Sequence, residues 1–271
     1  MFGPYGEAVL LGIVQGITEF LPISSDGHLA LAELLFKLET GGLTFNVMLH
    51  AGTLLATLIM LRERVGRAVS AGFRSVVAPR GFRETPGGRD ALTVILVSLP
   101  TALIGFSLRD PVERWTQNPM AIGFGFLATT AVLMLAQLTH PGDEEVPSLR
   151  GALLVGLAQG LAVLPGLSRS GSTIAVLLLL GVRRERAFEL SMLVSLPAVL
   201  GALLLESRHA FAEPFAGGPA LLGAVVAFGA GVLALDILRR LVVVGAFGWF
   251  AFWVGPLALA TIGMGLAWPS P

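Results

Sequence analysis

Apolar segments of about 20 residues recur along the chain, and they limit its possible folds more than any other feature. A transmembrane helix needs about 20 consecutive apolar residues. Only 13% of the residues are charged, against about 25% in soluble domains, so charges are too few to cover a water-soluble surface. We therefore expect one all-α, multi-pass membrane domain over residues 1–271. Six segments should cross the membrane: 45–61, 91–108, 120–138, 188–206, 218–238 and 241–267.

Two further apolar regions are interrupted by polar turns. Their pieces, each too short to cross a membrane, are 8–22 with 28–38 and 151–165 with 172–182. A re-entrant helical hairpin, which turns at mid-depth and returns to the side it entered from, fits both regions. Such a turn must be buried in protein or face a watery cavity. The alternative for the first region is a single proline-kinked helix over residues 8–38, since membrane helices tolerate proline.

The basic residues predict the orientation. The loop 62–90 contains seven arginines, so it should be cytoplasmic. If both broken regions are hairpins, the basic loops 139–150, 183–187 and 239–240 fall on the same side, whereas one crossing in place of one hairpin would separate them. The arginines around Glu185 then read as solvated ends of spans, and residues 206–219 as an outer loop.

This topology makes the two hairpins enter from opposite sides, as in an inverted repeat. The expected repeats are about 1–138 and 151–271. Inverted repeats place the site at their interface near mid-membrane, with half-helix N-termini facing anions. At a fixed offset of 144, five residues recur in order: Gly12, Gln15, Gly16, Ser24 and Gly27 with Gly156, Gln159, Gly160, Ser168 and Gly171.

The first turn, in QGITEFLPISSDGH, contains costly polar groups for a membrane interior. Gln15 and Glu19 are four residues apart and share one helix face. Glu19 could hold a divalent cation, act as a base or orient a neighbour; the alternative is a buried hydrogen-bonded pair that holds the hairpin together.

A hydroxyl near an imidazole is a minimal activated nucleophile, and Ser24, Ser25 and His28 follow Glu19 closely. Ser and Gly also occur in ordinary tight turns, so this spacing alone is weak. We interpret Asp26 as a helix cap. His28 could be a satisfied histidine at a helix start, but its neighbours favour a catalytic role. His50 is interpreted equally as packing or as support for the site.

The second turn, in PGLSRSGST, suits an anion. Hydroxyls and amide N–H groups at a helix N-terminus bind phosphate oxygens, and the Arg169 guanidinium can bind phosphate through two parallel hydrogen bonds. The hydroxyls beside it are Ser168, Ser170 and Thr173. The alternative is an ion pair between Arg169 and Glu19 across the repeat interface, which could open for substrate.

QGITEFLPISSDGH together with PGLSRSGST resembles the undecaprenyl-diphosphate phosphatase family, also called bacitracin-resistance proteins. Gln15 to Glu19 is similar to the family's (E/Q)xxxE motif, and Pro165 to Thr173 matches PGxSRSxxT without a gap. The likeness extends to flanks such as FNVMLHAGTLLA and RRERAFELSMLVSLPA. One departure is Gln15, where many members have Glu, which weakens any mechanism that needs two carboxylates on a metal.

The resemblance implies hydrolysis of undecaprenyl diphosphate to the lipid carrier phosphate used in cell-wall synthesis. It implies a divalent cation (Mg²⁺ or Ca²⁺) at Glu19, a bacterial inner-membrane location with the site open to the periplasmic face, and a homodimer. Glu19 is then the essential acid, Ser25 and His28 the reacting pair, and Arg169 the diphosphate ligand. The residues lining the phosphate pocket would be Gln15, Ser24, Ser168, Ser170 and Thr173.

A second hypothesis is a transporter or flippase of a polyprenyl phosphate, because broken helices in inverted repeats are typical of secondary transporters. Neither hypothesis involves nucleic acid, since the formal net charge is zero. The chain contains no cysteine, which excludes a disulfide, a thiolate metal site and a cysteine nucleophile.

Overall fold

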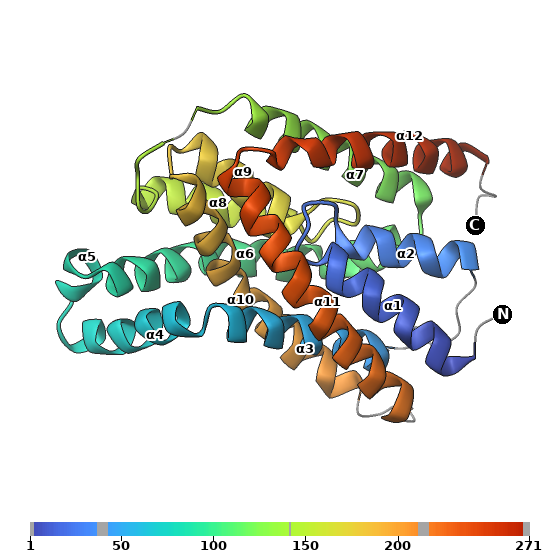
Figure 1. The fold of residues 1–271 in the computed structure, drawn as a ribbon, viewed down its shortest axis with the longest axis horizontal. Coiled ribbons are helices and arrows are strands. Elements are labelled where there is room, and N and C mark those ends of the chain that lie inside the picture. Colours follow the sequence, from blue (N-terminus) through green and yellow to red (C-terminus); the bar gives the residue numbers. More distant parts are fainter. Residues whose placement is uncertain (1–2, 37–42, 141, 211–216, 268–271) are drawn as a thin grey trace.

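The computed structural model describes residues 3–36, 43–140, 142–210 and 217–267. In these ranges the chain forms helices joined by turns, and the only β-type pairing is an isolated bridge between Glu144 and Val182. Figure 1 shows the helices gathered into one bundle, with several of them running along the long axis of the molecule. The all-α prediction is confirmed.

Five helices among the described residues are long and apolar enough to cross a membrane. Each coincides with one of the predicted spans, and the chain is therefore a multi-pass membrane protein. Their bounds are α6 (Pro86–Trp115), α7 (Pro119–Gln137), α10 (Arg184–Ala210), α11 (Gly217–Val243) and α12 (Ala251–Ala267), which the 3-10 turn η1 (Phe247–Phe250) precedes.

Several predicted boundaries shift, and α6, for example, is longer at both ends than the predicted span 91–108. The last span does not begin at residue 241, because α11 continues to Val243 and the chain turns before η1. The apolar sequence continues without interruption across this point, so hydropathy could not place the break. The expected outer loop 206–219 is narrower, since α10 extends to Ala210 and α11 begins at Gly217; residues 211–216 lie outside the described residues.

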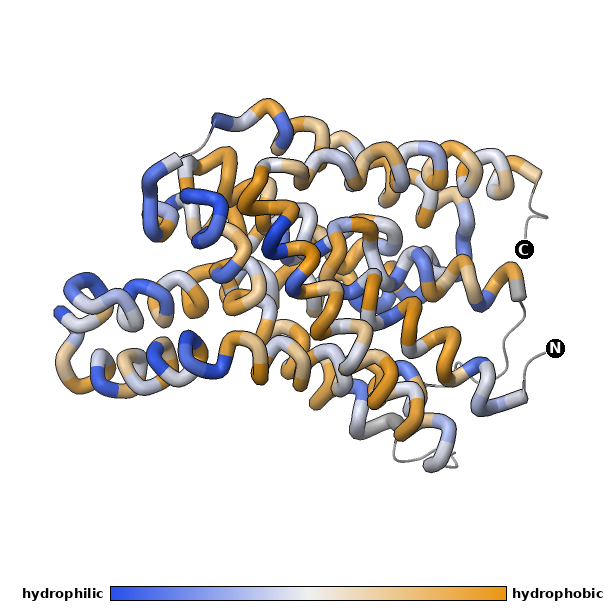
Figure 2. Tube along the Cα trace, viewed as in Figure 1, coloured by the Kyte–Doolittle hydropathy of each residue, from blue (hydrophilic) through white to orange (hydrophobic). Residues whose placement is uncertain are grey.

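The remaining predicted span, 45–61, belongs to a bent pair. Helix α3 (Leu43–Met60) is followed after Leu61 by α4 (Arg62–Val77), at an angle of 82°. The apolar sequence stops where α4 begins. Helix α4 packs against α6 and against the short α5 (Gly81–Glu84). Figure 2 shows many hydrophilic residues along α4 and α5, at the left end of the molecule.

The two interrupted regions form two pairs of short helices. The first pair is α1 (Pro4–Thr18) and α2 (Ser25–Phe36), and the second is α8 (Leu149–Leu161) and α9 (Arg169–Leu179). The two helices of each pair pack together. At 1.5 Å per residue, helices of 11 to 15 residues are about 16–22 Å long, which is less than the roughly 30 Å of a hydrocarbon core. The turns of both pairs lie near the centre of Figure 1.

Glycines let each pair pack closely on a long helix. A Cβ atom at Gly16 of α1 would lie 2.6 Å from the carbonyl oxygen of Ala227 in α11. A Cβ atom at Gly156 of α8 would lie 2.4 Å from the carbonyl oxygen of Val97 in α6. No side chain fits at such distances. The α1 and α8 backbones therefore lie directly against α11 and α6, which fixes the positions of both turns.

Candidate active site

The turn before α2 has an unusual backbone. Ser24 has a φ of 71°, which is uncommon for a residue other than glycine. The His28 Nδ1–H donates to the Ser24 carbonyl oxygen at 2.8 Å, and Ser24 Oγ accepts from the Gly27 N–H at 3.4 Å. Ser24 therefore caps α2. This corrects the prediction for Asp26, which lies in the first turn of α2 and lines a cavity instead.

The turn before α9 is fixed by α7. Gly166 has a φ of 85°, and a Cβ atom there would lie 2.2 Å from the Ile122 carbonyl oxygen of α7, so only glycine fits. Thr129, also on α7, donates through Oγ1 to the Gly166 carbonyl oxygen at 2.8 Å and accepts from the Ser168 N–H at 2.8 Å. Ser168 Oγ accepts from the Gly171 N–H at 3.1 Å and caps α9. Arg169 is thereby held at the start of this helix.

The two turns meet through an ion pair. Arg169 Nη2 donates to Glu19 Oε1 at 2.5 Å. Beside this pair, Ser170 Oγ donates to the Leu21 carbonyl oxygen at 3.4 Å. Residues 150 positions apart in the sequence are thus joined, as the ion-pair alternative predicted. Because both side chains are largely buried, each charge depends on the other for compensation, and removing one leaves an unpaired buried charge.

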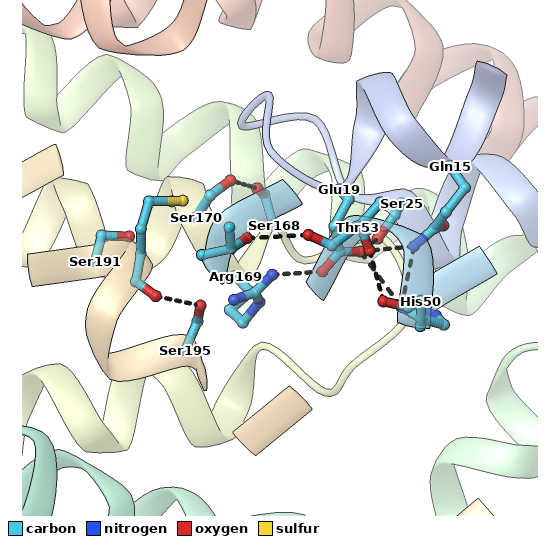
Figure 3. A network of polar contacts seen from close by, with 12 residues as sticks. Gln15, Glu19, Ser25, His50, Thr53, Ser168, Arg169, Ser170, Ser191 and Ser195 are labelled. Atoms are coloured by element: carbon cyan, nitrogen blue, oxygen red, sulfur yellow. Dashed lines mark hydrogen bonds and ion pairs between the residues drawn. The ribbon is translucent and has the colours of Figure 1, made fainter. Parts of the chain in front are cut away.

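Glu19 is the centre of a polar cluster, shown in Figure 3. Its other oxygen, Oε2, accepts from Ser25 Oγ at 2.8 Å and from Gln15 Nε2 at 3.0 Å. His50 Nδ1 lies 3.0 Å from the same Gln15 nitrogen and 3.7 Å from Glu19 Oε2. We call Gln15, Glu19, Ser25, His50 and Arg169 the site cluster. It combines a carboxylate, a hydroxyl, an imidazole and a guanidinium within a few ångströms.

A cavity of about 280 Å³ borders the site cluster. It is lined by both turns, by α3 and α6, and by the C-terminal part of α10. Arg169 is the only Lys or Arg among its lining residues, whereas Glu19, Asp26 and Glu206 contribute carboxyl groups. The other lining residues are Thr18, Ser24, Ser25, His50, Thr101, Val112, Gln159, Ala162, Val163, Leu167, Ser168, Ala198, Val199, Ala202 and Leu203.

Two hydroxyls predicted to line the phosphate pocket have other partners and are not part of the cavity lining. Ser170 Oγ lies 3.3 Å from Ser168 Oγ. Thr173 Oγ1 lies 2.9 Å from the Arg169 carbonyl oxygen and 2.6 Å from Ser191 Oγ of α10. In this arrangement the two side chains hold the turn and α9 in place, while Ser168 lines the cavity.

The structure does not bring His28 and Ser25 together as a hydroxyl–imidazole pair. His28 Nδ1 is bonded to the Ser24 carbonyl oxygen, and His28 Nε2 accepts from Trp253 Nε1 at 3.2 Å. The His28 ring stacks on Trp253 and meets Phe126 edge-on. Both ring nitrogens are therefore occupied, and the Ser25 hydroxyl points to Glu19. The spacing in the sequence could not reveal these aromatic neighbours, because they come from α7 and α12.

Three ionisable cavity residues were not predicted as site residues. Asp26 was interpreted as a cap, His50 was left between packing and support, and Glu206 was not considered. The signal for His50 was a histidine in an otherwise apolar span, where polar groups are costly. The signal for Glu206 was weaker, because an acid at the end of a span is usually solvated.

The Glu19 region offers oxygen ligands to a cation. Within the described part of the chain, no group of three or more His, Asp and Glu side chains is arranged to hold a metal ion. Gln15 Oε1, however, is buried without a hydrogen-bond partner, while Nε2 of the same amide donates to the Glu19 carboxylate. Mg²⁺ is commonly held by one or two carboxylates with substrate phosphates and water. The residues fit a cation that takes its remaining ligands from a bound phosphate compound.

Comparisons with known proteins agree over nearly the full length. The family model described as bacitracin resistance protein BacA matches residues 8–260. A relative from Desulfosudis oleivorans, named undecaprenyl-diphosphatase, is 40% identical over 273 residues, covering 96% of this chain and 98% of that protein. Relatives of the same name from Carboxydothermus hydrogenoformans and Korarchaeum cryptofilum are 36% and 34% identical, over 94% and 95% of this chain and 95% and 98% of theirs.

Proposed function

Because the chain belongs to the bacitracin resistance protein BacA family, we propose that it is an undecaprenyl-diphosphatase. It hydrolyses undecaprenyl diphosphate to undecaprenyl phosphate and inorganic phosphate and so returns the lipid carrier to cell-wall synthesis. The observation that carries this proposal is the contact of Ser25 Oγ and Arg169 with the two oxygens of one carboxylate, Glu19, beside a cavity. A nucleophile, a base and an anion ligand are thus adjacent.

In the proposed topology, α1–α2 and α8–α9 are re-entrant hairpins in an inverted repeat with six crossings. The packing supports it, since α1 lies on α11 through glycines as α8 lies on α6. The offset of 144 is also kept in the contacts of the two glutamines. Gln15 contacts His50, and Gln159 donates to the carbonyl oxygen of Val194, the residue 144 positions after His50.

We place the protein in the bacterial inner membrane with the cavity open to the periplasm. The cavity is lined by Val112 and Glu206, near the C-terminal ends of α6 and α10. These ends are opposite the arginine-rich α4 and α5, which the positive-inside rule assigns to the cytoplasm. The homodimer implied by the family resemblance stays a prediction, which the molecular mass of the protein in detergent would test.

Substrate binding follows from the charge balance of the site cluster. The terminal phosphate bonds to the Arg169 guanidinium, which suits two parallel hydrogen bonds to phosphate oxygens. The Arg169–Glu19 bond opens as the anion takes its place. A divalent cation held by Glu19 and Gln15 Oε1 would neutralise part of the phosphate charge. Such neutralisation and positioning account for most of the catalysis in phosphoryl transfer.

The chemical step uses the Ser25 hydroxyl. Its proton moves to Glu19 Oε2 as Ser25 Oγ bonds to the terminal phosphorus, and the bond from that phosphorus to the bridging oxygen breaks. Undecaprenyl phosphate leaves with the bridging oxygen. Water then attacks the phosphoserine, the phosphorus–Oγ bond breaks, and Glu19 returns its proton to Oγ. His28 acts on this step by holding the Ser24 carbonyl group, and therefore the position of Ser25, rather than by removing the proton.

Phosphate release from undecaprenyl diphosphate by the purified protein in detergent micelles tests this function. Micelles allow no movement between two compartments, so a transporter would release no phosphate. We expect release by the unaltered protein and a loss of about 10²–10⁴-fold in kcat for Ser25→Ala. The matched control is Ser107→Ala, which removes an exposed hydroxyl bonded only to the Leu103 carbonyl oxygen. Absence of release by the unaltered protein would overturn the proposal.

A further inference from the structure

The orientation of His50 is determined by Gln15. The Gln15 Nε2 group has two hydrogens, and its neighbours at 3.0 Å are Glu19 Oε2 and His50 Nδ1. The reverse orientation of this amide would place its oxygen against the carboxylate oxygen of Glu19. An amide nitrogen can only donate. His50 Nδ1 must therefore accept, and the neutral imidazole of His50 carries its proton on Nε2.

The Nε2–H of His50 is available to a ligand. His50 lines the cavity, and its Nε2 has no hydrogen-bond partner among the described residues. The backbone holds the residue in place, since its carbonyl oxygen accepts from Thr53 Oγ1 at 3.0 Å. In contrast, both ring nitrogens of His28 are occupied. Between these two histidines, His50 is the one that can donate to a molecule in the cavity.

The cavity needs such a donor if it is to hold a diphosphate. Its lining has three carboxyl groups, from Glu19, Asp26 and Glu206, and only one guanidinium, from Arg169. A diphosphate has more oxygens than one guanidinium can bond. Arg169 bonds to Oε1 of Glu19, and His50 Nδ1 lies 3.7 Å from Oε2 of the same carboxylate. An anion that displaces Glu19 from Arg169 therefore occupies the cavity that His50 also lines.

We propose that the His50 Nε2–H donates a hydrogen bond to a phosphate oxygen of the substrate, as a second ligand of the diphosphate beside Arg169. This assignment rests on the proposed function for the identity of the substrate. The tautomer and the placement in the cavity depend only on the contacts of Gln15, Glu19 and His50.

Two conservative substitutions separate this role from a structural one. His50→Asn keeps an acceptor near the position of Nδ1 for Gln15, but has no atom at the position of Nε2. His50→Gln reaches the position of Nε2 with an N–H group, but gives Gln15 no acceptor at the position of Nδ1. A phosphate ligand tolerates Gln and not Asn, whereas a residue that only supports Gln15 tolerates Asn and not Gln. His140→Asn, at an exposed position, is the matched control.

The experiment measures KM for undecaprenyl diphosphate and, separately, the binding of inorganic diphosphate by calorimetry. We expect His50→Asn to raise KM and to weaken diphosphate binding by about tenfold, the equivalent of one hydrogen bond. His50→Gln should stay within about threefold of the unaltered protein in both measurements. Equal binding by all three proteins, the reverse order of the two variants, or no binding of diphosphate by the unaltered protein would each overturn the proposal.

The two measurements also keep this proposal apart from the proposed function. If the unaltered protein releases no phosphate but binds inorganic diphosphate more tightly than His50→Asn, the phosphatase assignment fails and the role of His50 stands. If it releases phosphate and the binding does not change in either variant, the phosphatase assignment stands and the role of His50 fails.

Discussion

The described residues contain two clusters of buried and half-buried charges, and the clusters differ in what surrounds them. The site cluster borders a cavity of about 280 Å³. The second, which we call the arginine cluster, joins α4, α6 and α10 to the segment before α8, and none of its residues lines that cavity. Its members are Arg64, Asp90, Glu145, Arg186 and Glu189.

The arginine cluster consists of carboxylates paired with guanidinium groups. Asp90 accepts from Arg186 at 2.7 Å and from Arg64 at 2.8 Å, one on each oxygen. Glu189 is bonded to both arginines as well. A guanidinium does not lose its proton in proteins, so the two arginines cannot act as acid or base, and the pairs hold three helices together.

The site cluster differs in composition and contains a polar atom that has no hydrogen-bond partner. Its Glu19 contacts a hydroxyl, an amide and an imidazole as well as one guanidinium, and the neighbouring Gln15 Oε1 has no partner. A hydroxyl and an imidazole can move protons, and the proposed mechanism has an anion from the cavity take the place of the carboxylate on Arg169. Buried charge alone therefore does not mark a candidate site in this protein, whereas buried charge beside a cavity and a hydroxyl does.

The largest expected effect on activity comes from Glu19→Gln. We expect kcat to fall by about 10²–10⁴-fold, because the base for Ser25 is lost. Arg169 lines the cavity, where water can solvate its unpaired guanidinium, so thermal unfolding in detergent should change less than for a substitution in the arginine cluster. Steady-state phosphate release and thermal unfolding of the same sample measure both quantities. Activity within threefold of the unaltered protein would remove Glu19 from the chemistry and erase the distinction between the two clusters.

Asp90→Asn tests whether the arginine cluster stabilises the fold without taking part in the reaction. Removing this charge leaves Arg64 and Arg186 with Glu189 as their shared carboxylate, and we expect a destabilisation of about 1–3 kcal/mol from the lost charge-assisted hydrogen bonds. The specific activity of the folded fraction should stay within about threefold. Asp236→Asn is the control, since Asp236 pairs with Arg240 at 2.8 Å on an exposed helix face, where a pair contributes about 0–1 kcal/mol. A lost activity with unchanged stability would show that the arginine cluster takes part in the reaction.

Arg169→Lys tests whether the guanidinium acts through its two parallel hydrogen bonds or only through its charge. Lysine keeps the positive charge but cannot form two parallel hydrogen bonds to a phosphate. We expect kcat/KM to fall by about 10–100-fold, measured by phosphate release over a range of substrate concentrations. Intact activity would mean that this position supplies only charge.

The smallest expected effect is that of Trp253→Phe. It removes the indole N–H that donates to His28 Nε2 and keeps an aromatic ring beside the imidazole. We expect a loss of about 0.5–1.5 kcal/mol in the free energy of unfolding and little change in kcat. Trp249→Phe, at a position 70% exposed, is the control. A large drop in kcat for Trp253→Phe would show that His28 does more than position the turn.

Hydropathy was sufficient to predict the long helices, because a membrane span leaves a long apolar segment in the sequence. It was also sufficient to predict that two polar turns exist, since prolines and hydroxyls interrupt the apolar sequence there. It placed the break between α11 and α12 at residues 239–240, whereas α11 continues to Val243 and the break lies in the apolar sequence that follows. We predicted Arg186 to lie at the solvated end of a span, although this residue is only 4% exposed. Its partners Asp90 and Glu145 are distant in the sequence, so hydropathy could not reveal them.

The site was predictable where the partners share one helix face or where the expected repeat brings the two turns together. Gln15 and Glu19 meet as their four-residue spacing predicted, and Arg169 meets Glu19 as the ion-pair alternative predicted. The position of His28 was not predictable, because Phe126 and Trp253 reach it from α7 and α12. The same holds for His50, whose place depends on the packing of α3 beside α1.

A double-substitution cycle on Glu19 and Arg169 tests most directly whether the two turns form one site. Phosphate release is measured for Glu19→Gln, for Arg169→Gln and for the variant with both changes. Two groups that act on the same phosphate should be strongly coupled, so the double variant should be no more than about tenfold slower than the slower single variant. If the two losses in kcat/KM multiply, the turns act independently, and the account of a single site between them is wrong.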